Sequence, residues 1–144
     1  MRRVQLEFCR TNARVHVLNL VFIATSWSAT KGGINALNHD LCAVVATQGL
    51  AVTCIVPVKN SSEFEEAEGL GVKLISLGSS DEFDSNSIGV IELDCADLCG
   101  GGAVWIGHGI KTGDFALACK EGFGGTSILF HHMDFSNYYS TLNP

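Results

Sequence analysis

Residues 15–34 read VHVLNLVFIATSWSATKGGI, and this stretch decides the fold. An apolar run over Val15–Ala24 gives way to a glycine pair, and a helical pattern starts directly after it. Glycines at such a turn let the backbone approach a ligand, while the helix start offers unpaired N–H groups and the positive end of a dipole. The turn therefore predicts a fold that handles nucleotides or sugar phosphates, with Lys31, Gly32 and Gly33 around the phosphate. A purely steric role for the glycines is the alternative.

Apolar runs and helical patterns continue to alternate along the chain. After a first strand at 17–24, we expect strands at 51–57, 72–77, 103–107 and 126–130, and helices at 34–49, 61–68 and 112–121. Residues 86–98 fit a helix better than a strand, because their length and position suit a crossover. Short connections and right-handed crossovers predict an α/β fold: a doubly wound, Rossmann-like parallel sheet of five strands in the order 3-2-1-4-5.

The first two expected helices carry recognisable faces and ends. In the first helix the apolar residues fall on one face, and Gly49 ends it. Ser61 or Ser62 is the expected cap of the second helix, whose acidic residues suit the first turns of a helix. The apolar face of the first helix consists of Ile34, Leu37, Leu41, Val44 and Val45.

Length and charge limit the function classes. A chain of 144 residues is expected to form one domain with a stable core. The formal net charge is −6 and no basic stripe occurs, which argues against nucleic-acid binding. Polar residues interrupt residues 1–25, so a buried strand fits this region better than a signal peptide does. No run reaches the ~18 apolar residues that a membrane span needs.

Six cysteines raise the questions of disulfides and zinc: Cys9, Cys42, Cys54, Cys95, Cys99 and Cys119. Cys42 lies on an apolar helix face and Cys54 lies inside a strand, where each thiol is expected to be buried singly. Cys95 and Cys99 are four residues apart, but no second pair with metal-ligand spacing follows them. We therefore predict reduced thiols, no metal site and a cytoplasmic location.

Polar clusters follow three of the expected strands. Lys31 with its glycines follows the first, His108 follows the fourth, and His131 and His132 follow the fifth. The carboxyl ends of parallel strands share one sheet edge, so these clusters are expected to converge there. Neighbouring residues on a strand point to opposite faces, so one of the two adjacent histidines is expected to face the cleft. His108 as a turn residue bonded to backbone is the alternative for that position.

Three segments resemble the N-terminal half of GT-B glycosyltransferases, especially the glycogen-synthase-like and family 4 type. FIATSWSATKGGINALNHDL is similar to the family's first strand, Lys-x-Gly-Gly loop and following helix. WIGHGIKTGDFAL is similar to its His-Asp-Trp-x-x-Gly segment: His108 and Gly113 keep the spacing, while Gly109 replaces the aspartate. ILFHHMDF is similar to its strand ending in His-Asn, with His131 at the histidine and His132 at the asparagine.

The resemblance implies a half of a GT-B fold and a function. Residues 1–14 would be an N-terminal extension, and residues 15–144 a glycosyltransferase N-terminal domain that is incomplete at its C-terminal end. With the missing second Rossmann domain, it would transfer a sugar from a nucleotide sugar to a sugar or glycan acceptor, without a cofactor; the isolated chain would be inactive. His131 would be the catalytic contact to the transferred sugar, and the substrate- and phosphate-binding residues would be Lys31, Gly32, Gly33, His108 and His132.

Two other functions remain open at this stage. One is a glycosyltransferase-like binding or sensor module of a larger multidomain protein. The other is a generic flavodoxin-like or nucleotide-binding domain. A second Rossmann domain with a Glu-x7-Glu-like motif in the same protein would favour the enzyme, whereas an NTPase or repeat region would favour the module.

Overall fold

The computed structural model describes residues 18–78 and 102–132, together with Phe83, Gly89, Ile91 and Leu98. The crossover expected at 86–98 therefore lies largely outside the described residues, as do the extension at 1–14 and the aromatic segment after His132. Elements in chain order are β1 (Asn19–Ile23), the 3-10 helix η1 (Ala29–Lys31), α1 (Gly33–Thr47), β2 (Ala51–Val56), α2 (Ser61–Gly69), β3 (Val72–Ser76), β4 (Ala103–His108), α4 (Gly109–Phe123) and β5 (Thr126–Phe130).

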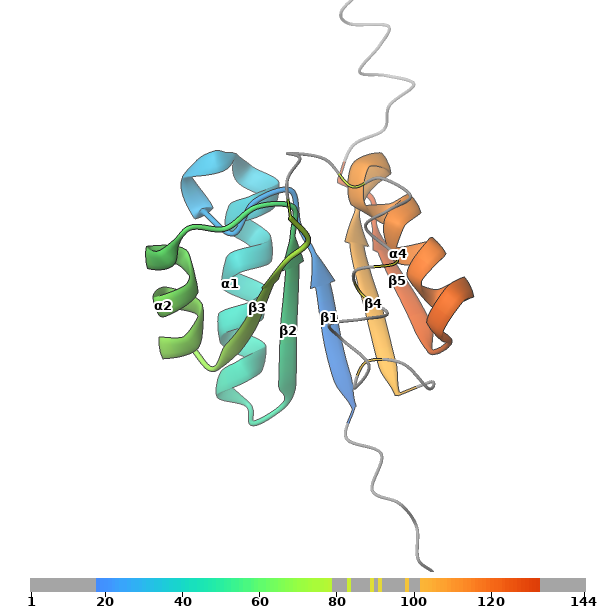
Figure 1. The fold of residues 1–144 in the computed structure, drawn as a ribbon, viewed down its shortest axis with the longest axis horizontal. Coiled ribbons are helices and arrows are strands. Elements are labelled where there is room, and N and C mark those ends of the chain that lie inside the picture. Colours follow the sequence, from blue (N-terminus) through green and yellow to red (C-terminus); the bar gives the residue numbers. More distant parts are fainter. Residues whose placement is uncertain are drawn as a thin grey trace, which may run out of the picture.

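The five strands form one parallel sheet in the order β3-β2-β1-β4-β5. This confirms the predicted Rossmann-like order, with β1 next to both β2 and β4. Helices α1 and α2 cover one face of the sheet and α4 covers the other (Figure 1). None of the described helices is long and apolar enough to cross a membrane.

Two hydrophobic clusters lie on the two faces of the sheet, because alternate residues of each strand point to opposite sides. Val21 and Ile23 of β1 belong to the cluster on the α4 side, which also contains Trp105. Phe22, between them, belongs to the cluster under α1 and α2, together with Trp27. Strands that are apolar on both faces are typical of a parallel sheet covered by helices on both sides.

Helix α1 buries only part of the face that its apolar residues suggest: Leu41 and Val45 pack against the core, and the other three predicted residues are exposed. Ile34, Leu37 and Val44 retain 41%, 40% and 60% of their exposure. Two asparagine side chains shift the buried face, because each amide finds hydrogen-bond partners inside the protein that offset the usual cost of burying a polar group. The buried residues of α1 are Asn35, Asn38 and Cys42.

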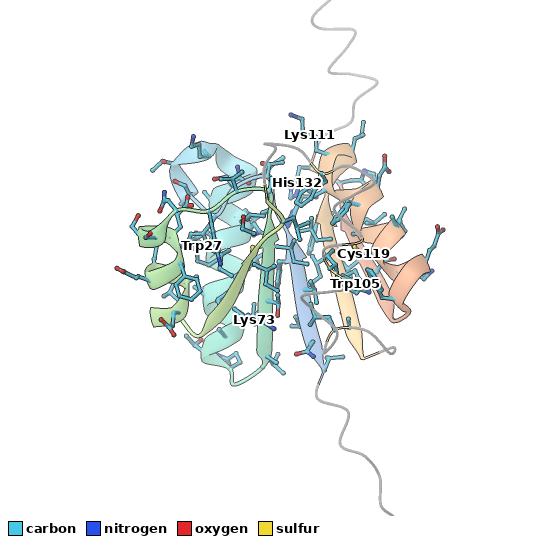
Figure 2. All side chains as sticks on the ribbon, viewed as in Figure 1. Trp27, Lys73, Trp105, Lys111, Cys119 and His132 are labelled. Carbon is cyan, nitrogen blue, oxygen red and sulfur yellow. The ribbon has the colours of Figure 1, made fainter. Side chains whose placement is uncertain are left out.

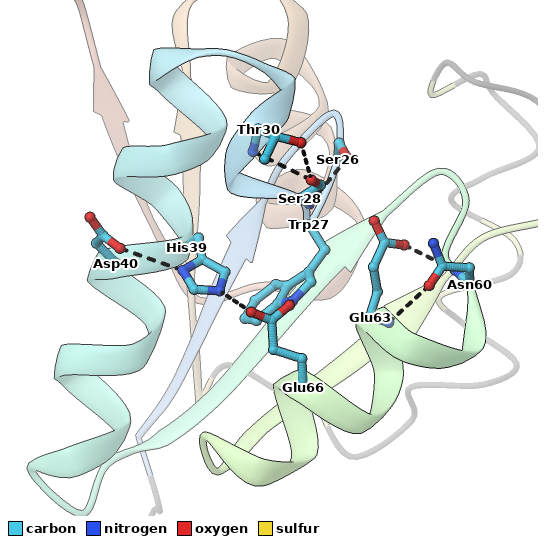
Figure 3. Close-up of polar contacts among 9 residues, drawn as sticks. All are labelled: Ser26, Trp27, Ser28, Thr30, His39, Asp40, Asn60, Glu63 and Glu66. Carbon is cyan, nitrogen blue, oxygen red and sulfur yellow. Dashed lines mark hydrogen bonds and ion pairs between the residues drawn. The ribbon is translucent and has the colours of Figure 1, made fainter.

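The cap of α2 is Asn60, not Ser61 or Ser62 as predicted. The Asn60 Oδ1 atom accepts the Glu63 backbone N–H at 2.9 Å, and the Glu63 Oε2 atom accepts the Asn60 N–H at 2.9 Å (Figure 3). This reciprocal pair is a capping box, which satisfies two otherwise unpaired donors.

Helix α4 begins at Gly109, three residues earlier than predicted. The Thr112 hydroxyl accepts the backbone N–H of His108 at 2.6 Å and lies 3.1 Å from the His108 carbonyl oxygen. These contacts fix the backbone where β4 passes into α4. His108 is therefore the last residue of the strand, and the helix begins at the next residue.

Trp27, in the loop after β1, ties that loop to both helices on its face (Figure 3). The buried indole donates its Nε1–H to Glu66 Oε2 at 3.0 Å, and its ring lies 4.7 Å from the ring of His39. His39 in turn contacts Glu66 Oε1 at 3.3 Å. His39 therefore has a structural role: together with Glu66 it fixes Trp27, and so the loop that leads into the glycine turn.

The thiols of Cys42 and Cys54 form a buried pair, which corrects the prediction that each would be buried singly. Asn38 Nδ2 lies 3.8 Å from Cys42 Sγ and 3.6 Å from Cys54 Sγ. Neither cysteine is in a disulfide. The pKa of the Cys42 thiol lies well above its ordinary value, because it is hydrogen-bonded to Cys54, is buried, and would be repelled by a charged neighbour.

We expect thiol reagents to distinguish this buried pair. Both thiols are buried away from the reagent, and the raised pKa of Cys42 further lowers the fraction of its reactive thiolate form. Alkylation of the native chain should leave Cys42 and Cys54 unlabelled, and peptide mass spectrometry would show this. In denaturant without reductant, all six cysteines should titrate as thiols; two or fewer would contradict the prediction of reduced cysteines.

Candidate functional site

The carboxyl ends of β1, β4 and β5 lie at one edge of the sheet, because these neighbouring strands are parallel. Lys31 and its glycines follow β1, His108 ends β4, and His131 and His132 follow β5. His132 and Lys111, at the start of α4, lie at this edge in Figure 2. The topology therefore places all the predicted site residues on the same side of the molecule.

The glycine turn has an open backbone at the start of α1. Gly32 caps the helix with φ +115°, a conformation that favours glycine, and Gly33 is the first helical residue. A Cβ atom at either position would meet no other atom within 4 Å. The space beside both residues is thus free for a ligand, and the first N–H groups of a helix have no partner within it. The positive φ of Gly32 accounts for that glycine on backbone grounds, whereas no crowding requires a glycine at Gly33.

His108 is buried and is held by polar contacts on both ring nitrogens. Its Nε2 atom lies 3.1 Å from Asn38 Oδ1, and its Nδ1 atom lies 2.8 Å from His132 Nε2. An amide oxygen only accepts, so His108 carries its proton on Nε2 and accepts through Nδ1. His132 therefore donates from Nε2, which leaves its Nδ1 atom for another partner. Phe130 stacks on the His108 ring, with centroids 5.2 Å apart.

The environment keeps His108 neutral. Burial, and then the positive charge that His132 can carry, lower the pKa of His108 from 6.5 to about 4. With His108 neutral, its Nδ1 lone pair accepts from His132 while its Nε2–H donates to Asn38. Asn38 thus positions His108, and His108 positions His132.

This arrangement predicts acid sensitivity. The unfolded chain binds a proton on His108 near pH 6.5, while the folded chain does so only near pH 4. Stability should therefore be complete above pH 6.5 and fall as the pH drops toward 4, by on the order of 3 kcal/mol from this residue. Urea unfolding at pH 7 and pH 4.5 would measure the loss. His108→Gln should reduce the pH-dependent part, and His39→Gln should not; equal losses in both variants would contradict the assignment.

A separate cavity of about 430 Å³ lies over the ends of β1 and β2. Asn35, which is 6% exposed, reaches it from α1: its Oδ1 atom accepts the Thr25 hydroxyl at 3.1 Å, and its Nδ2 atom donates to the Lys31 carbonyl at 3.1 Å. The lining residues are Thr25, Ser26, Lys31, Asn35, Pro57, Val58, Lys59, Asn60 and Glu63.

The predicted site residues thus fall into two neighbouring groups, one around the His108–His132 contact and one at the cavity. The structure brings His108 and His132 into contact, and it places Lys31 in the wall of the cavity instead. His131 is exposed directly after β5. Among the described residues, no group of three or more histidine, cysteine or acidic side chains has the arrangement of a metal site.

Sequence reasoning missed Asn35 and Asn38, which connect the two groups. Asn35 reaches the cavity and Asn38 reaches His108, and the two residues are one helical turn apart on α1. Two amides at this spacing in the first turns of a mainly apolar helix are the signal that would have indicated them.

The fold is that of a Rossmann-like domain, with an open helix start after β1 and two imidazoles in contact after β4 and β5. Residues 21–142 match the family described as "Family 4 Glycosyltransferase in conflict systems". The chain therefore belongs to this family and carries a family 4 glycosyltransferase domain.

Curated relatives give a second, partial similarity. The chain is 34% identical over 104 residues to the arginine biosynthesis bifunctional protein ArgJ, mitochondrial, of Neosartorya fischeri, and 33% identical to the protein of the same name from Aspergillus niger. Each match covers 72% of this chain but only 21% of the relative, so the chain spans about a fifth of their length. No solved structure matches the chain.

Proposed function

We propose that residues 15–144 are the N-terminal domain of a GT-B glycosyltransferase, which transfers a sugar from a nucleotide sugar to a sugar or glycan acceptor. The family match supports the glycosyltransferase class. The observation that carries the finer proposal is the shared edge, where an open glycine turn after β1 lies on the same side as the histidines after β4 and β5. In this proposal residues 1–14 are an extension.

Each residue of the edge has a role in this proposal. Gly32 and Gly33 approach the donor diphosphate through their backbone, and the start of α1 favours its negative charge. Lys31 adds a positive charge. His131 contacts the transferred sugar, and His132 presents its Nδ1 atom at the neighbouring position. The donor binds without a metal ion or cofactor.

A second Rossmann domain is required for transfer in this proposal. Positioning the donor against the acceptor supplies much of the rate of a two-substrate reaction. One half of the cleft leaves the donor largely in water, where a single helix start contributes little binding energy. The isolated chain should therefore bind a diphosphate weakly and transfer no sugar.

A transfer assay tests this division of labour. The purified chain should show no turnover with UDP-glucose and a glucan acceptor, whereas the same chain joined to a second Rossmann domain in its natural protein should show turnover that His131→Ala reduces. Steady turnover by the 144-residue chain alone would contradict the two-domain requirement. Diphosphate binding without transfer in the whole protein would favour the sensor module instead.

A further inference from the structure

Basic and polar side chains line the cavity over the ends of β1 and β2. Two lysines, Lys31 and Lys59, reach it from opposite sides: one ends η1 and the other precedes α2. We propose that this cavity binds a hydroxylated ligand of sugar size that carries a phosphate or carboxylate group, and that the two lysines hold its anion. The role of this ligand as the glycosyl acceptor rests on the proposed function; its chemistry does not.

The residues around the cavity carry a net positive charge, whereas the chain as a whole carries a net negative charge. The protein has nine basic and 15 acidic residues and a formal net charge of −6, yet two lysines and one acidic residue, Glu63, line this cavity. Glu63 already accepts the Asn60 N–H within the capping box of α2. The lining residues that the structure describes therefore carry a formal charge of +1, which favours an anion in a half-enclosed site where screening by water is reduced.

Lys59 is held in place without using all its donors. Its Nζ atom donates to the Leu74 carbonyl at 3.1 Å and lies 4.6 Å from the centre of the Phe64 ring. An ammonium group has three hydrogens, so these two contacts leave one for a ligand. A lysine fixed in this way loses less side-chain entropy on binding than a freely rotating one.

The remaining polar groups suit hydroxyls. Asn35 has a second amide hydrogen beyond the one it donates to the Lys31 carbonyl. Ser26 accepts the Ser28 N–H at 3.2 Å, a bond that does not use its own hydroxyl hydrogen (Figure 3). Thr25 donates to Asn35 and keeps its oxygen lone pairs as acceptors. The wall thus offers both donors and acceptors, as a sugar or polyol requires.

Size restricts the ligand further. A volume of about 430 Å³ lies toward the small end of ligand sites in proteins. It suits one ring with its anionic group, and the apolar part of the wall is limited to Pro57 and Val58 beside the lysine stems. An unsubstituted hydrophobic ligand would leave the remaining hydrogens of the Asn35 amide and the Lys59 ammonium group without an acceptor.

Amide NMR titration of the whole chain with glucose 6-phosphate tests this proposal. Shifts are expected at residues 25–26 and 58–63, and an equal concentration of glucose should produce far smaller ones. Glucuronate, as a second titrant, shows whether the site also takes a carboxylate. Loss of one ammonium contact should weaken binding of glucose 6-phosphate about tenfold in Lys31→Gln and in Lys59→Gln.

Control variants separate charge from folding. Lys59→Arg keeps the charge and should retain most of the affinity, and Lys120→Gln, in the last turn of α4, should bind like the parent chain. Lys31 is exposed, so its variant remains informative if Lys59→Gln unfolds. Equal binding of glucose, equal binding of inorganic phosphate, or unchanged affinity in Lys31→Gln would overturn the proposal.

The same titration distinguishes this proposal from that of the donor site. Residues 58–63 could respond to glucose 6-phosphate while Gly32 and Gly33 do not respond to UDP-glucose. This pattern would support the cavity proposal and contradict the proposed donor site. The reverse pattern would overturn the cavity proposal and leave the proposed glycosyltransferase function in place.

Discussion

Gly107→Ala is expected to destabilise the chain by about 3 kcal/mol or more, because backbone atoms occupy the space that a methyl group would need. A Cβ atom on Gly107 would lie 2.5 Å from the backbone carbonyl oxygen of Thr112 and 2.8 Å from the Gly113 Cα atom. Neither atom can move without shifting the first turn of α4. Gly107 therefore allows β4 and α4 to approach closely directly beside His108.

Urea unfolding of Gly107→Ala and of Gly122→Ala would measure this effect. Gly122 also lies in α4, but a Cβ atom there would meet nothing within 4 Å. Alanine favours a helix over glycine by up to about 1 kcal/mol, so Gly122→Ala should be neutral or stabilising. Similar stability of the two variants would contradict the close approach of β4 and α4.

Asn38→Leu is expected to cost about 2–4 kcal/mol, although leucine has the same branched shape. Asn38 is 1% exposed, and its amide contacts His108 and the sulfur atoms of Cys42 and Cys54. Leucine would leave the His108 Nε2–H buried without an acceptor, and an unsatisfied buried donor costs its full desolvation. Chemical denaturation at pH 7 would measure the loss.

Asn38→Asp gives a readout that a merely structural role would not produce. A carboxylate beside Nε2 favours the charged imidazole, so the pKa of His108 should rise clearly above its value of about 4. NMR titration of the imidazole signals would follow both histidines. An unchanged His108 titration in Asn38→Asp would contradict the contact between these side chains.

The strands could be predicted because their apolar runs are long enough to be buried on both faces and are separated by helical patterns. The order of the sheet followed from short connections and crossover handedness. The burial of α1 could not be predicted in the same way. Hydrophobic periodicity assumes that apolar residues face inward, whereas Asn35 and Asn38 are inside because Thr25 and His108 satisfy their amides.

The site was predictable to the level of the sheet edge, and no further. Parallel strands bring residues at their carboxyl ends together, so Lys31, His108, His131 and His132 were expected on one side. Which histidine meets His108 depends on the register of β5, where Phe130 pairs with His108 and places His132 on the same face. The cavity next to β2 depends on Lys59 and the cap of α2, to which no motif pointed.

Amide NMR titration with UDP-glucose tests the central claim most directly, namely that the edge at β1, β4 and β5 is the donor-binding half of a glycosyltransferase. The account predicts weak binding, in the millimolar range because only a few contacts contribute, with shifts at residues 30–36 and at His131 and His132. ADP and UDP should move the glycine turn but not the histidines, since they carry no sugar. Absence of any response at Gly32 and Gly33 would contradict the claim.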